Sequence, residues 1–171
     1  MYKVGLVALP RFALAGVSTL LQSVQEREWR LRVFSLAGDS VTTAEGLRVM
    51  ADAAMQDTVP LDLHLLVIPG GHYTSEIWND TRLHRFLRQY DGQRRWIATA
   101  SEGIICVAAA GLLGGTMYSA PEGVDSAFAH LLRHAIRRQS PVTVDANVIS
   151  SDGTEPATFA NVVCQRVELQ F

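Results

Sequence analysis

The chain has 171 residues, of which 48% are apolar, and a formal net charge of −2 at pH 7. This length and apolar content suit one core, so we predict a single domain over residues 1–171. The near-neutral charge provides no basic surface for a nucleic acid backbone, which favours a small neutral molecule or another protein as the partner. The two cysteines, Cys106 and Cys164, are too few for a disulfide framework and indicate a reducing compartment.

No targeting or membrane segment is evident. The apolar N-terminus reaches Pro10 and Arg11 too early for a signal peptide. No stretch approaches the roughly 20 apolar residues of a membrane span. We therefore expect a cytoplasmic protein with no membrane partner.

The first part of the chain alternates between short apolar runs and an amphipathic segment. Val4–Leu9, Leu31–Leu36 and the aliphatic run Leu63–Ile68 are typical of buried strands. Leucines and valines at helical spacing between the first two predict a helix that ends at the charged stretch 25–28. Region 41–50 is predicted to hold short strands.

The same alternation continues towards the C-terminus. A helix capped by Asn79 or Asp80 is predicted, with an apolar stripe formed by Leu83, Phe86, Leu87 and Tyr90. The strand Trp96–Ala100 is followed directly by a helix of small residues over Ile104–Ala110. We then predict a helix from Asp125 or Ser126 through Arg138, paired short strands within Val142–Ile149, and a last helix opened by Thr154-Glu155-Pro156. This order predicts an α/β fold whose mostly parallel sheet has helices on both faces.

The junction Ala100-Ser101-Glu102-Gly103 leaves no room for a loop between strand and helix. Such a junction forces Ser101 into a tight turn and needs a small residue two positions later, which Gly103 supplies. The turn would raise the serine hydroxyl above the sheet and direct helix N–H groups at a bound oxyanion. Ligands of open α/β sheets bind beyond the carboxyl ends of strands, so we predict the functional site here and at the loop after Ile68.

A buried strand that ends in Pro69-Gly70-Gly71 is followed, on the next predicted strand, by Ile-Ala-Thr-Ala-Ser-Glu-Gly and then by Ala-Ala-Ala-Gly-Leu-Leu-Gly-Gly. This combination resembles the ThiJ/PfpI superfamily, from Tyr2 to Gly153-Thr154. The resemblance implies a flavodoxin-like three-layer sandwich, a class I glutamine amidotransferase-like nucleophile elbow and a homodimer. We expect no cofactor and no metal.

Three positions depart from the family pattern. Family members with characterised chemistry usually carry a cysteine at the elbow, tuned by an acidic side chain from the first helix region. This chain has Ser101 and Ala13 at those positions, and the histidine or polar residue often found after Gly-Leu-Leu falls near Ala120 or Pro121. The pattern favours a divergent or non-catalytic member that binds a small molecule or serves in a stress response.

Two catalytic alternatives remain open. A serine nucleophile needs a base, and the candidates are His72, which follows the glycine pair, and Glu102. With the Gly70 and Gly71 amides as oxyanion donors, Ser101 could act in a hydrolase or amidase of the PfpI-like intracellular protease type. The second alternative is a stress protein of glyoxalase or deglycase type.

Other candidates have structural explanations. Cys106 and Cys164 are expected to pack as buried thiols, and His130 and His134 share one helical face but lack a third ligand. Acidic residues that could line the pocket mouth are Glu122, Asp125 and Glu155. Aromatic residues that could mark a partner surface or anchor the rim of the core are Trp29, Tyr73 and Trp78.

Overall fold

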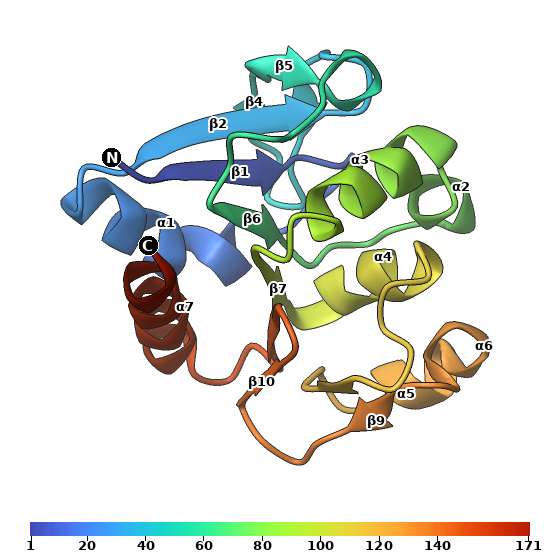
Figure 1. The fold of residues 1–171 in the computed structure, drawn as a ribbon. Coiled ribbons are helices and arrows are strands. Elements are labelled where there is room, and N and C mark those ends of the chain that lie inside the picture. Colours follow the sequence, from blue (N-terminus) through green and yellow to red (C-terminus); the bar gives the residue numbers. More distant parts are fainter.

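A seven-stranded sheet forms the centre of the computed structural model, which describes all residues 1–171 (Figure 1). Its order is β10-β11-β7-β6-β1-β2-β5, and every pairing is parallel except the β10–β11 hairpin. Strands β1, β2, β6, β7 and β11, taken in chain order, lie as 2-1-3-4-5, which is the flavodoxin-like order. The strands are β1 (Lys3–Val7), β2 (Arg30–Ser35), β5 (Ala53–Ala54), β6 (Leu65–Ile68), β7 (Trp96–Ala100), β10 (Val142–Asp145) and β11 (Val148–Ser151).

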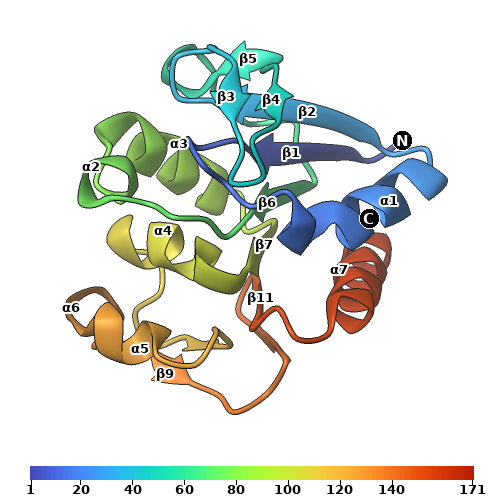
Figure 2. The ribbon, with the colours of Figure 1, turned by 180° about the vertical axis from the view of Figure 1, so that it is seen from behind.

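Helices cover both faces of this sheet. Helices α1 (Ser18–Glu26) and α7 (Pro156–Gln170) pack together on one face, and α3 (Thr81–Asp91) and α4 (Ile104–Ala109) pack on the other (Figures 1 and 2). The shorter helices are η1 (Ala15–Val17), η2 (Met55–Asp57), α2 (Ser75–Trp78), η3 (Ser101–Gly103), α5 (Val124–Ala127) and α6 (Ala129–Leu132). Two small sheets pair β3 (Val41–Thr42) with β4 (Arg48–Val49) and β8 (Met117–Tyr118) with β9 (Ile136–Arg137). The predicted three-layer α/β sandwich is confirmed.

Helix α3 shows how sequence patterns become packing. The Asp80 carboxylate caps it by accepting a hydrogen bond from the Arg82 amide at 2.8 Å. Its predicted apolar stripe is buried in the core. The stripe consists of Leu83, Phe86, Leu87 and Tyr90. The cap and the stripe together fix where the helix begins and which side faces the core.

The helix predicted through Arg138 is wrong. The chain forms two single turns, α5 and α6, and then the strand β9, which pairs with β8. Phe128 interrupts the helical path with φ −120° and ψ 31°, and its ring packs edge-on against Trp78 with 5.3 Å between ring centroids. This tertiary contact and the β8–β9 pairing outweigh the weak helical preference of the segment.

His130 and His134 do not lie on one helical face, as the predicted helix would have placed them. His134 lies beyond the end of α6, so it does not share a helix with His130. Nowhere in the chain do three or more His, Cys, Asp or Glu side chains form a group that could hold a metal ion. No helix is long and apolar enough to cross a bilayer.

The aromatic residues considered for a partner surface belong to the core instead. Trp29 and Tyr73 are buried, and Trp78 is half-buried with its indole Nε1 inaccessible to solvent. Trp29 stacks edge-on with Tyr2 at 5.0 Å between centroids. Of the two alternatives, their burial therefore favours the anchoring of the core rim over a partner surface.

Candidate functional site

The junction after β7 has the backbone geometry that the sequence predicts. Ser101 has φ +50°, a left-handed conformation that non-glycine residues rarely adopt. The turn η3 starts at this residue and continues into α4 without a loop. A Cβ at Gly103 would collide with the Ile68 carbonyl oxygen and lie 2.9 Å from that of Pro69. Glycine at 103 therefore lets the turn lie directly on the end of β6.

The loop after β6 contacts this turn. Gly71 forms a β-bridge with Phe12, and the Ala13 amide donates a hydrogen bond to the Gly70 carbonyl at 2.7 Å. A Cβ at Gly70 would lie 3.0 Å from the Ser101 Cβ. The amides of Gly70 and Gly71 donate no hydrogen bond within the protein; Gly70 is buried, whereas Gly71 is partly exposed. Of the residues predicted for the site, Ala13, the glycine pair and Ser101 thus meet at one edge of the sheet.

Two buried titratable groups lie close to this loop. The Tyr73 hydroxyl donates to the Pro69 carbonyl at 2.6 Å. Burial raises the pKa of Tyr73 well above its ordinary value, and the nearby Cys106 and Glu102 raise it further. Burial also raises the pKa of the Cys106 thiol to about 12. Cys106 is therefore a neutral, buried thiol at ordinary pH, as the sequence predicts.

Neither predicted base contacts the Ser101 hydroxyl through a hydrogen bond. His72 is exposed and its ring takes part in no hydrogen bond. Glu102 is half-buried, and its Oε2 lies against Gly70, where a Cβ would come within 2.5 Å of it. The Ser101 Oγ also has no hydrogen-bond partner. The structure brings Glu102 beside the turn but leaves His72 on the surface.

A contact that the sequence did not indicate fixes the Ala13 edge. Glu45 lies between β3 and β4, and its two carboxylate oxygens accept hydrogen bonds from the amides of Leu14 and Ala15 at 3.0 and 2.9 Å. These bonds, led by that from Ala15, lower the pKa of Glu45 despite its slight desolvation. A carboxylate that caps a helix start in this way holds the segment after Ala13 in place.

A third loop, after β11, completes the surroundings of Ser101. Gly153 has φ +86°, and a Cβ there would lie 2.7 Å from the Ser101 Oγ. The neighbouring Asp152 Oδ1 accepts hydrogen bonds from the Thr154 amide at 2.9 Å and hydroxyl at 2.6 Å. This local turn sets Gly153 directly over the hydroxyl of Ser101.

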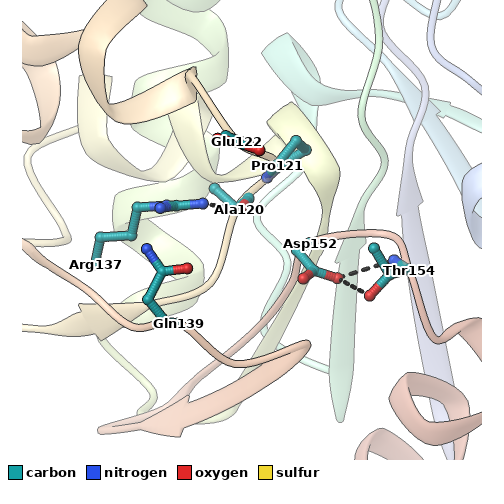
Figure 3. Close-up of a pocket in the computed structure, with 7 residues that line it drawn as sticks. All are labelled: Ala120, Pro121, Glu122, Arg137, Gln139, Asp152 and Thr154. Atoms are coloured by element: carbon teal, nitrogen blue, oxygen red, sulfur yellow. Dashed lines mark hydrogen bonds between the residues drawn. The ribbon is translucent and has the colours of Figure 1, made fainter.

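A cavity of about 360 Å³, which we call the charged pocket, opens beside this loop (Figure 3). Asp152 and Thr154 line it, and Gly153 between them contacts the Ser101 region, so the pocket is next to the turn. In Figure 3 the Arg137 side chain extends towards Ala120 from the side opposite Asp152. The full lining is Ala120, Pro121, Glu122, Arg137, Gln139, Asp152 and Thr154.

Hydrogen bonds of Ser119, the residue after β8, hold one wall of this pocket against the β10–β11 hairpin. The Ser119 amide donates to the Ser150 hydroxyl at 2.8 Å, and the Ser119 and Thr143 hydroxyls lie 2.6 Å apart. Ser119 and Ser150 are fully buried. Because Ala120 follows Ser119 directly, these bonds set the distance between the β8 and β11 walls.

The acidic residues proposed for the pocket mouth separate in the structure. Glu122 lines the charged pocket, Asp125 lines a neighbouring cavity, and Glu155 is the exposed N-cap residue of α7. Sequence reasoning missed Arg137 and Asp152. Asp152 could have been found, because it follows the carboxyl end of a parallel strand. Arg137 was hidden by the wrongly predicted helix.

Comparisons with known proteins agree with this architecture. A family model described as the DJ-1/PfpI family matches residues 2–166. No curated protein sequence matches the chain. Among solved structures, a ThiJ/PfpI domain protein from Brachyspira murdochii is 17% identical with a TM-score of 0.86, over 99% of this chain and 97% of that one.

Two further structures have similar scores. A mutant of a DJ-1 superfamily protein from Salmonella typhimurium is 20% identical with a TM-score of 0.82, over 98% of this chain and 90% of that one. Drosophila melanogaster DJ-1beta is 16% identical with a TM-score of 0.83, over 97% and 90%. At these identities the structures establish the fold, and the family model covers nearly the whole length. The chain therefore belongs to the DJ-1/PfpI family.

Proposed function

We propose that this protein is a small-molecule-binding member of its family that binds its ligand without covalent chemistry at Ser101. One observation carries the proposal: the charged pocket lies next to the turn, while no hydrogen bond joins the Ser101 hydroxyl to a base. A serine hydroxyl is a weak nucleophile near neutral pH unless a base removes its proton. The pocket can hold a ligand without that step.

The arrangement around Ser101 supports binding in a second way. The amide of the partly exposed Gly71 donates no hydrogen bond within the protein and can bind a carbonyl or carboxylate oxygen without any proton transfer. Ala13 occupies the edge where the resemblance places an acid in reactive members, and its small side chain leaves the hydroxyl without a charged partner. The polar groups around the turn thus suit recognition.

A fluorophosphonate probe tests the proposal directly. We expect no labelling of the wild-type protein between pH 6 and 9, measured by intact-mass spectrometry, because no base activates the hydroxyl. The matched control is Ser101→Ala, which must give the same mass trace. Labelling that appears in the wild type and vanishes in Ser101→Ala would overturn the proposal.

A serine hydrolase or amidase is the second candidate. The observation in its favour is the positive φ of Ser101 directly before a helix, the backbone shape of a nucleophile elbow. In such an enzyme Glu102 or a reoriented His72 would be the base, with the Gly70 and Gly71 amides binding the oxyanion. Probe labelling abolished by Ser101→Ala, together with hydrolysis of p-nitrophenyl acetate lost in the same variant, would establish it.

The glyoxalase or deglycase type is tested by restoring the reactive groups. If only those groups are missing, the double variant Ser101→Cys with Ala13→Glu should gain methylglyoxal turnover over the wild type. No gain, in a variant whose thermal unfolding is unchanged, would mean that the surrounding pocket has also diverged. We expect no gain, because Arg137, Glu122 and Asp152 suit another ligand.

A further inference from the structure

The charged side chains of the charged pocket form no ion pair inside the protein. Ion pairs occur elsewhere, between Lys3 and Asp62, Arg27 and Glu168, and Asp80 and Arg82. None of the three charged residues of the pocket, Arg137, Glu122 and Asp152, is in an ion pair, although they line one cavity. Opposite charges that share a cavity without pairing are available to a ligand that carries both signs.

Arg137 has donors to spare. Its Nη2 donates one hydrogen bond, to the Ala120 carbonyl at 3.2 Å, and its Nε is buried without a partner. That single bond holds the guanidinium towards the pocket, as Figure 3 shows. A guanidinium presents several N–H groups in a planar fork that matches a carboxylate. The buried Nε is out of reach, so a ligand carboxylate would use the N–H groups of Nη1 and Nη2 that the protein leaves unpaired.

Two carboxylates of the pocket offer acceptors: Asp152 lies across the pocket from Arg137, whereas Glu122 follows Pro121 on the segment whose Ala120 carbonyl Arg137 binds (Figure 3). One oxygen of Asp152 accepts both hydrogen bonds from Thr154, and the other oxygen makes none within the protein. Glu122 is exposed at the rim and makes no side-chain hydrogen bond. A ligand ammonium group has three N–H donors, which carboxylates such as these accept.

Resting on the proposed function, we infer that the charged pocket binds a small zwitterion with one free carboxylate and one free ammonium group, such as an amino acid or a short peptide. Arg137 binds the carboxylate, and Asp152 and Glu122 bind the ammonium group. The cavity of about 360 Å³ has room for a molecule of this size. Its lining includes only small apolar surfaces, from Ala120 and Pro121, which gives little recognition of a large hydrophobic group.

Calorimetric titration of the whole chain with matched probes tests the inference. The probes are alanine, dialanine and trialanine, each compared with its N-acetyl form and its C-terminal amide. We expect at least one free zwitterion to bind at least about tenfold more tightly than either blocked form, because a charged hydrogen-bonded contact is lost in each. The inference is wrong if none of the three binds at millimolar concentration, or if the blocked forms bind as well as the free one.

Substitutions in the charged pocket test which side chains bind the carboxylate of the ligand and which bind its ammonium group. Arg137→Gln should abolish the preference for the free carboxylate and keep that for the free ammonium group, whereas Asp152→Asn with Glu122→Gln should do the reverse. Arg138→Gln is the matched control, because this exposed neighbour contacts Met117 and does not line the charged pocket. The preferences are ratios within one variant, so a change in stability does not imitate the result. Preferences that stay unchanged in both pocket variants would overturn the assignment.

Titrations repeated in Ser101→Ala separate this inference from the proposed function. If the fluorophosphonate probe labels Ser101, the non-covalent proposal fails, but the selectivity for both charges is still measured in the alanine variant. If labelling is absent and the zwitterion preference is also absent, the binding proposal stands with another ligand class and this inference fails.

Discussion

On one side of Ser101, Gly70, Gly71 and Gly103 let backbone segments approach so closely that a single Cβ would overlap a neighbour. On the other side, the charged pocket keeps Arg137 and two carboxylates around an open cavity without pairing them. The first side, which we call the glycine side, is determined by steric fit, and a change there disturbs the fold. The charged pocket instead presents charged side chains to a ligand, so a substitution there should alter ligand binding with little effect on the stability of the fold.

The largest expected effect comes from filling the glycine side. Gly103→Ala should lower the free energy of unfolding by about 3 kcal/mol, because the new Cβ meets rigid backbone at Ile68. Urea denaturation measures this value. Gly114→Ala is the control, since no atom lies within 4 Å of a Cβ there, and its effect should stay within about 0.5 kcal/mol. Equal losses in the two variants would contradict the steric explanation.

The strained backbone of Ser101 gives a smaller effect of opposite sign. Ser101→Gly should raise the free energy of unfolding by about 0.5 kcal/mol, because glycine adopts φ +50° without the steric cost that serine incurs. The greater conformational entropy of glycine in the unfolded chain offsets part of this gain. Ser23→Gly in the middle of α1 should instead lower stability by roughly 0.5–1 kcal/mol. Thermal and urea unfolding of both variants check the signs. A loss at Ser101 as large as that at Ser23 would show that the turn stores no strain.

The Ala13 edge of the glycine side should depend on pH through Glu45. Its pKa is lowered in the folded state, so its contribution to stability is present above the ordinary pKa and is lost as the pH falls through the folded value. Glu45→Gln should therefore cost about 1 kcal/mol or less near pH 7, as for an exposed cap, and less at pH 3.

Thermal unfolding between pH 3 and 7 measures this difference. Glu76→Gln is the control, because this exposed carboxylate makes no side-chain hydrogen bond in the structure. A Glu45→Gln curve that runs parallel to the wild type at every pH would mean that the hydrogen bonds to Leu14 and Ala15 contribute nothing through charge.

The smallest expected effect on stability lies in the charged pocket. Glu122→Gln should change the free energy of unfolding by no more than about 0.5 kcal/mol, because the carboxylate is exposed and unpaired. The same urea experiment as for Gly103→Ala provides the measurement. A loss above about 1 kcal/mol would place Glu122 among the structural residues and end the distinction between the two sides.

The two sides also differ in how far the sequence predicted them. The glycine side follows from local patterns: a strand ending in Pro69-Gly70-Gly71, and a strand-to-helix junction that needs Gly103. The charged pocket joins Glu122, Arg137 and Asp152 from three separate segments. Arg137 was missed because one helix was predicted where Phe128 breaks the path and Arg137 enters a strand, and Asp152 was overlooked although it follows the end of a parallel strand.

By itself the sequence determined the alternation of strands and helices, narrowed the N-cap of α3 to Asn79 or Asp80, and located the sharp turn at Ser101, because each depends on residues close together in the chain. Only the tertiary structure decided that His72 stays exposed, that Glu45 holds the segment after Ala13, and that Arg137 faces Asp152 across a cavity. The physical reason is the separation along the chain of the residues that interact. Backbone preference and periodicity act over a few residues, whereas contacts between distant segments depend on how the whole sheet and its helices pack.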